Sequence, residues 1–101
     1  MTGGKGPLRV DAGTVPRLGR GVRLQHDAAR TRWVVQAPER VLMPDDIAIA
    51  VLKRCDGRSS VGAIAADLAR EYGAPPETVE SDVREMLQDL ADKGIIADGR
   101  D

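Results

Sequence analysis

Apolar and polar residues alternate along the segment from Val22 to His26, and a period of two is typical of a strand with one buried face. Two further apolar segments, Arg32–Ala37 and Arg40–Met43, follow after short polar turns. Pro38 lies between these two segments and cannot donate a hydrogen bond to a neighbouring strand, so the middle strand should end there. The pattern therefore predicts a small antiparallel meander of three short strands.

After Pro44 the hydrophobic period lengthens to that of a helix. The first predicted helix begins at Asp45 or Asp46, because a carboxylate there can cap the free N–H groups of the first turn. It ends at Gly57, since glycine readily adopts the left-handed conformation that follows a last helical turn. A second helix, over residues 60–72, is predicted from apolar residues that recur three and four positions apart.

The third predicted helix runs from Pro76 to Lys93 and carries the clearest apolar stripe of the chain. That stripe consists of Val79, Val83, Met86, Leu87 and Leu90. The short apolar segment Ile95–Ala97 should then fold back onto the core. Three strands followed by three helices form an α+β layout. The spacing of the last two helices, with a small sheet attached, predicts a winged helix-turn-helix fold.

The first 18 residues show no sustained period and contain four glycines and two prolines. Such a composition is typical of a disordered tail or a linker. We therefore expect residues 1–18 to lie outside the folded unit, and residues 19–98 to form a single domain.

Few residues of the chain could support catalysis. His26 is the only histidine and has no serine or cysteine beside it, and Cys55 is the only cysteine. We interpret Cys55 as a buried small hydrophobic residue and the Asp45–Asp46 pair as a helix cap. The sequence therefore predicts that the protein is not an enzyme and needs no metal or cofactor. The sequence has no apolar run that could span a membrane and no signal segment, so a cytoplasmic location is expected.

Charge is distributed unevenly along the chain. Residues 1–40 contain eight basic and three acidic side chains, whereas the remaining residues contain seven basic and thirteen acidic ones. This asymmetry indicates either a partner-binding face or simply a basic sheet layered on acidic helices. A winged helix could bind DNA, but the predicted recognition helix, residues 76–93, has two basic and six acidic side chains. Acidic side chains oppose the approach to phosphates that supplies most of the affinity for DNA.

The third strand, Arg40–Met43, lies at an edge of the predicted meander and is apolar over Val41–Met43. Edge strands usually carry lysine, proline or a bulge that prevents further pairing. An apolar edge beside a helix stripe that contains Met86 favours a site where a peptide adds as a further strand. Two alternatives remain open: a DNA-binding regulator, and an interaction domain that dimerises by strand exchange through the same edge.

Four segments together resemble the PqqD family of peptide chaperones in pyrroloquinoline quinone biosynthesis. They are Gly21–Asp27, Trp33–Arg40, Cys55–Gly57 followed by Ser60-Val61, and Asp82-Val83 ahead of Leu87 and Leu90. The resemblance covers about residues 16–97. It implies a protein that binds the ribosomally made precursor peptide PqqA and presents it to a radical S-adenosylmethionine enzyme, PqqE. It implies binding and no catalytic residue. The exposed edge itself predicts either a monomer or a weak strand-exchanged dimer.

The resemblance also implies where the peptide binds: it pairs with the third strand and packs against the third helix. Carried over to this chain, the edge and the groove consist of Arg40, Val41, Leu42, Met43, Ile47, Val51, Val79, Val83, Arg84, Met86, Leu87 and Leu90.

Overall fold

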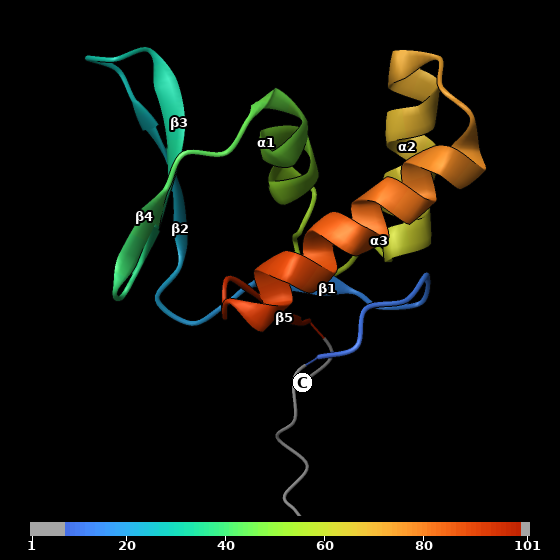
Figure 1. The fold of residues 1–101 in the computed structure, drawn as a ribbon, viewed down its shortest axis with the longest axis horizontal. Helices are drawn as coiled ribbons and strands as arrows, with labels where there is room; N and C mark the ends of the chain where they lie inside the picture. Colours follow the sequence, from blue (N-terminus) through green and yellow to red (C-terminus); the bar gives the residue numbers. More distant parts are fainter. Residues whose placement is uncertain (1–7, 100–101) are drawn as a thin grey trace, which may run out of the picture.

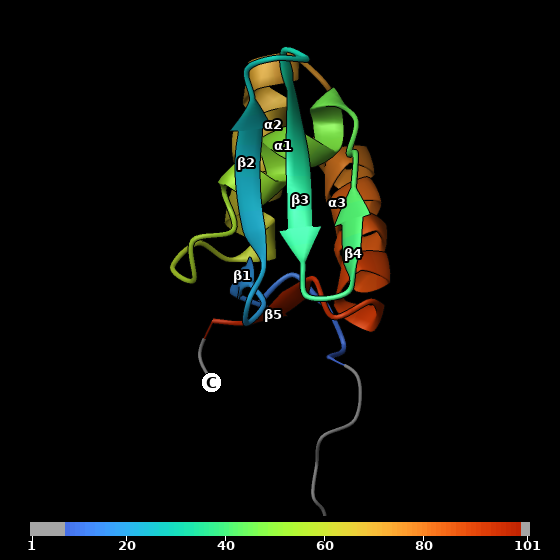
Figure 2. The same cartoon turned by 90° about the vertical axis from the view of Figure 1, so that its left-hand side faces the viewer.

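A computed structural model describes residues 8–99. Its larger sheet contains β2 (Arg23–Asp27), β3 (Arg32–Ala37) and β4 (Arg40–Leu42), paired antiparallel in the order β2-β3-β4 (Figure 2). The alternation seen in the sequence sets the register, because Leu24, Val35 and Leu42 lie opposite one another across the sheet. Val35, at the centre of this row, is buried. The predicted meander is confirmed.

Three helices follow the sheet: α1 (Asp46–Lys53), α2 (Val61–Tyr72) and α3 (Pro76–Asp92). Their starts lie where local sequence signals place them, but α1 ends at Lys53, with Arg54 as its C-cap, and not at the predicted Gly57. The side chain of Asp45 accepts a hydrogen bond from the Ala48 N–H at 2.8 Å and so caps α1. Ser60 caps α2 in the same way, and Gly73 ends α2 with a left-handed backbone, φ 62°. The small sheet and three helices have the arrangement of a winged helix-turn-helix (Figure 1).

The structure differs from the sequence prediction in the N-terminal segment. Residues 1–7 of the predicted tail lie outside the described residues, but from Leu8 onward the chain packs onto the domain. Residues Pro16–Leu18 form a strand, β1, which pairs antiparallel with β5 (Ile96–Asp98) to make a separate two-stranded sheet. Val10 is buried, and its N–H donates to the Gln88 side chain of α3 at 2.9 Å. The same side chain donates to the Leu8 carbonyl at 2.7 Å, so α3 holds this segment in place.

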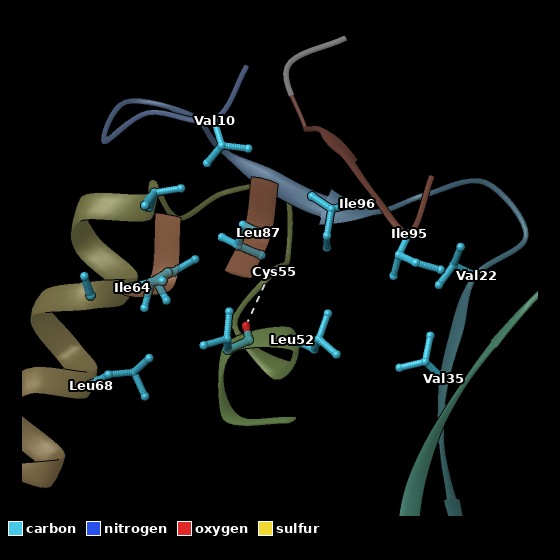
Figure 3. Packing of buried hydrophobic residues seen from close by; sticks show 14 residues of the cluster. Val10, Val22, Val35, Leu52, Cys55, Ile64, Leu68, Leu87, Ile95 and Ile96 are labelled. Carbon is cyan, nitrogen blue, oxygen red and sulfur yellow. Dashed lines mark hydrogen bonds between the residues drawn. The ribbon is translucent and has the colours of Figure 1, made fainter. Parts of the chain in front are cut away.

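The hydrophobic core is aliphatic and lies between the larger sheet, the helices and the β1-β5 sheet (Figure 3). Every element contributes at least one side chain to the buried cluster or to the partly buried residues packed against it, and β4 does so through Leu42. Ile95 and Ile96 are buried, which confirms that the chain after α3 folds back onto the core. None of the helices within the described chain combines the length and the apolar character of a membrane span.

An ionic cluster fixes α1 against α2. Arg54, directly after α1, donates to Asp67 of α2 at 2.8 Å, to Glu71 at 2.7 Å and to the Ala50 carbonyl at 2.8 Å. The hydrogen bond with Asp67 raises the pKa of Arg54 and lowers the pKa of Asp67. Because one guanidinium joins both helices, the position of α1 relative to α2 is well defined. This matters for function, since α1 lines the candidate site.

Candidate functional site

The site begins at the free edge of β4. This strand pairs with β3 on one side, and within residues 8–99 no strand pairs with its other side, which lies in front of α3 (Figure 2). The hairpin from β3 to β4 has a two-residue loop, with Ala37 opposite Arg40 and Gln36 opposite Val41. In such a hairpin the pair next to the loop exchanges hydrogen bonds and the following pair does not. The backbone N–H and C=O of Val41 are therefore directed toward the free edge.

Beside this edge lies an apolar hollow of about 330 Å³. We call it the strand-side hollow. Its apolar walls come from β3, from β4 and the two residues after it, from α1 and from α3, and include Leu42, Met43, Ala48, Leu52, Met86 and Leu90.

Two carboxylates, Asp45 and Asp89, also line the strand-side hollow. Asp45 is engaged as the cap of α1, and Asp89 accepts a hydrogen bond from Lys93 at 2.9 Å. Both carboxylates thus have a local structural partner. The remaining wall is mainly apolar, so the hollow suits aliphatic or aromatic side chains better than charged ones.

The structure separates the twelve predicted site residues into distinct groups. Leu42, Met43, Met86 and Leu90 come together around the strand-side hollow. Ile47 and Val79 lie around a neighbouring hollow, which Met86 also lines. Arg40 and Val41 on β4 and Arg84 on α3 are exposed but line neither hollow.

Three of the predicted site residues belong to the core instead. Val51 and Leu87 have no exposed surface and Val83 is 2% exposed, although Val83 forms part of the floor of the neighbouring hollow. A peptide can make little contact with these side chains, because they are already packed on all sides. Their role is to pack the core on which the residues of the two hollows rest.

The contribution of α1 to the strand-side hollow was not predicted residue by residue. The resemblance places Ile47 and Val51 at the groove, whereas Ala48 and Leu52 line the strand-side hollow. Both pairs are four residues apart and so form a stripe on one face of the helix. Shifting the pair by one residue turns that face by about 100°. The cap residue Asp45 marks where α1 begins, but a cap does not show which face of the helix turns toward the edge of β4.

Within residues 8–99 the structure shows no group of three or more His, Cys, Asp or Glu side chains that could hold a metal ion. His26 lies on β2 with its ring edge against Trp33 of β3, the centroids 5.1 Å apart. Lys53 lies over the same Trp33 ring at 4.3 Å, so α1 and the sheet meet at this aromatic side chain. These three residues make packing contacts away from the two hollows.

Cys55 is buried, and its thiol donates to the Val51 carbonyl at 3.3 Å. Burial raises the pKa of the thiol to about 12, and the nearby charge of Asp56 adds to the effect. Because the thiolate is the nucleophile, we expect Cys55 to react with iodoacetamide at pH 8 at least about tenfold more slowly in the folded protein than in urea. A mass-spectrometric time course would measure both rates. Equal rates would contradict the buried position of the thiol.

The same raised pKa gives a pH dependence of stability. The folded state holds the thiol proton up to about pH 12, whereas an unfolded cysteine releases it near its ordinary pKa of 9.0. The contribution of Cys55 to stability is thus complete below pH 9 and is lost as the pH rises toward 12. Replacing Cys55 with Ala should flatten the fall of stability in this range, as measured by urea unfolding.

The fold and the site together define a winged-helix domain with a free strand edge beside an apolar groove, an arrangement suited to binding an extended peptide. The family model described as coenzyme PQQ synthesis protein D (PqqD) matches residues 32–96. The chain therefore belongs to the PqqD family.

Individual relatives agree with this assignment. The chain is 47% identical over 94 residues to a PqqA binding protein of Bradyrhizobium diazoefficiens, covering 93% of this chain and 91% of the relative. It also resembles the solution structure of the PqqD part of Methylobacterium extorquens PqqCD, described as a functional, stand-alone recognition element for ribosomally synthesised and post-translationally modified peptides. The TM-score is 0.75 at 45% identity, over 87% of this chain and 94% of that one.

A second solved structure, the crystal structure of PqqD from Xanthomonas campestris, matches less closely in shape. Its TM-score is 0.53 at 46% identity, with 83% of this chain and 93% of that chain covered. The two solved structures are thus almost equally similar to this chain in sequence but differ in how well they superpose on it.

Proposed function

We propose that this protein binds the precursor peptide PqqA of pyrroloquinoline quinone biosynthesis, and that the peptide adds as a strand to the free edge of β4. The observation that carries the proposal is the position of that edge, directly beside an apolar hollow lined by β4, α1 and α3. The names of the relatives, which describe binding of PqqA, support the choice of ligand.

The geometry limits how much peptide can pair with β4. The strand has three residues and so spans about 10 Å. Backbone hydrogen bonds to Val41 would supply affinity that does not depend on the peptide sequence. Alternate side chains of the added strand would point into the strand-side hollow, where Leu42, Met86 and Leu90 select apolar groups. Met86 suits this role because its flexible thioether adapts to different shapes.

The proposed role is binding and presentation rather than catalysis. A peptide held in extended form on this domain can be presented to a radical S-adenosylmethionine enzyme that resembles PqqE. Holding the peptide near such an enzyme would raise its effective concentration there. In the absence of peptide the same edge could pair with a second copy of the chain, so a weak dimer would compete with peptide binding.

An amide chemical-shift titration with a synthetic PqqA peptide tests the proposal. We expect shifts concentrated in residues 40–52 and 79–90, and none with a peptide of the same composition in scrambled order. Shifts confined to the outer face of β2, around Arg23, would contradict the site. A sedimentation series without peptide would detect self-association through the edge as a concentration-dependent mass.

DNA binding is the weaker alternative because of the charges on α3. This helix and its C-cap, Lys93, carry two basic and six acidic side chains. A mobility shift with a steep dependence on salt would favour the alternative.

A further inference from the structure

A second apolar hollow, of about 230 Å³, lies between α1, α2 and α3. We call it the helix-side hollow. It is smaller than the range of about 300–1,000 Å³ typical of small-molecule sites, and so fits a side chain better than a metabolite. Its walls include Ile47, Leu68, Tyr72, Ala74, Val79 and Met86.

Met86 lines both hollows, so the two adjoin along α3. Figure 1 shows α1 between β4 and α2, with α3 running diagonally across α2 and below α1, and Figure 2 shows β4 in front of α3. A bound peptide that leaves the edge of β4 near Met43 and continues along α3 therefore passes the first turn of α1 and reaches the helix-side hollow. The helix-side hollow is thus a continuation of the proposed peptide groove.

The exposed apolar residues follow the same path. Among residues 8–99, four large hydrophobic residues are exposed. They and the exposed fractions of their surfaces are Val41 (56%), Met43 (62%), Ile47 (47%) and Tyr72 (51%). Met43 lines the strand-side hollow, and Ile47 and Tyr72 line the helix-side hollow. Exposed apolar residues that lie together, rather than scattered over the surface, mark an interaction surface.

Charge along the path indicates what the occupant should carry. No lysine or arginine lines either hollow within the described chain, whereas Asp82 of α3 lines the helix-side hollow. Unlike those of Asp45 and Asp89, the side chain of Asp82 has no hydrogen bond or ion pair with another residue of the described chain. A cationic side chain beside an apolar one would complement this wall.

We propose, on the basis of the proposed function, that the precursor peptide continues beyond β4 and places a second apolar side chain in the helix-side hollow, with a lysine or arginine next to it facing Asp82. Along α3, Val79 and Leu90 are separated by about 16 Å of helical rise. An extended chain covers this distance in about five residues. The two apolar anchors of the peptide therefore lie within about five residues of each other.

Calorimetry with synthetic PqqA and single-alanine versions of it tests this inference. Tyr72→Ala should weaken binding by about fivefold, because it removes one wall of the helix-side hollow. Arg70→Ala, an exposed change two residues earlier on α2 and outside both hollows, is the matched control and should bind as the parent does. One peptide of the alanine series lacks the apolar side chain that enters the helix-side hollow. The Tyr72→Ala protein and the parent protein should bind that peptide with equal affinity.

Asp82→Asn is a second, independent variant on an exposed position of α3. It should weaken binding about threefold at low salt and less at high salt. Glu85→Gln removes the same charge from α3 outside both hollows and should change binding by less than about 1.5-fold.

The outcomes separate this inference from the proposed function. If Tyr72→Ala and Asp82→Asn both bind as the parent does while Val41→Pro binds weakly, the helix-side hollow is unoccupied and the inference is wrong, although the proposed function stands. If the parent protein does not bind the peptide at all, both are wrong.

Discussion

Val41→Pro is expected to weaken binding of the precursor peptide by about 2 kcal/mol, roughly 30-fold, and to leave the domain folded. The register of the β3–β4 hairpin directs the N–H of Val41 toward the free edge. Proline at this position removes a donor that the peptide needs and leaves a peptide carbonyl unsatisfied. Proline here removes no donor from the β3–β4 ladder, because Val41 and the residue opposite it, Gln36, do not exchange hydrogen bonds. Isothermal calorimetry would measure the loss.

The control for this variant is Val41→Thr, which keeps both the N–H and the β-branched shape favourable in a strand. It should bind the peptide within about twofold of the parent. An unchanged pattern of amide shifts outside residues 38–44 would show that Val41→Pro is folded. If a folded Val41→Pro protein binds with the affinity of the parent, the peptide does not pair with this edge.

Leu87→Ala is expected to lower the free energy of unfolding by about 3 kcal/mol, because Leu87 has no exposed surface and its loss leaves a cavity in the core. Leu90→Ala, one turn further along α3, should lower it by only about 1 kcal/mol, since Leu90 is partly exposed at the strand-side hollow. Urea unfolding followed by circular dichroism would measure both changes.

Peptide binding should show the reverse order for these two leucines. At a temperature where both variants are folded, Leu90→Ala should weaken binding more than Leu87→Ala does, because only Leu90 lines the strand-side hollow. A larger loss of affinity for Leu87→Ala would mean that the peptide reaches the core side of α3, which would contradict the assignment of the groove.

Most of the fold could be predicted from local sequence signals. The alternation at Val22–His26 and the caps Asp45 and Ser60 specify strands and helices through contacts within a few residues. β1 could not be predicted in this way. It has three residues, too few to show a period, and its partner β5 lies at the other end of the chain. The buried position of Val10 likewise depends on Gln88, far away in the sequence.

The site was predicted less completely than the fold, for a reason that α3 makes clear. Its apolar stripe is wide enough to serve two surfaces, and periodicity cannot distinguish the residues that face the core from those at the margin. Val83 and Leu87 face the core, whereas Met86 and Leu90, each three residues further on, lie at the groove. Only the packing of α1 and the sheet against α3 decides which side of the stripe stays open.

Hydrogen exchange at the Val41 amide tests the central claim most directly. Free in solution, this N–H is directed away from β3 and should exchange rapidly, and saturating peptide should slow its exchange by at least about tenfold through a new backbone hydrogen bond. The neighbouring Leu42 amide, which the register directs toward β3, should change much less. If the peptide is bound and the Val41 amide still exchanges as fast as in the free protein, the peptide does not add to β4 as a strand.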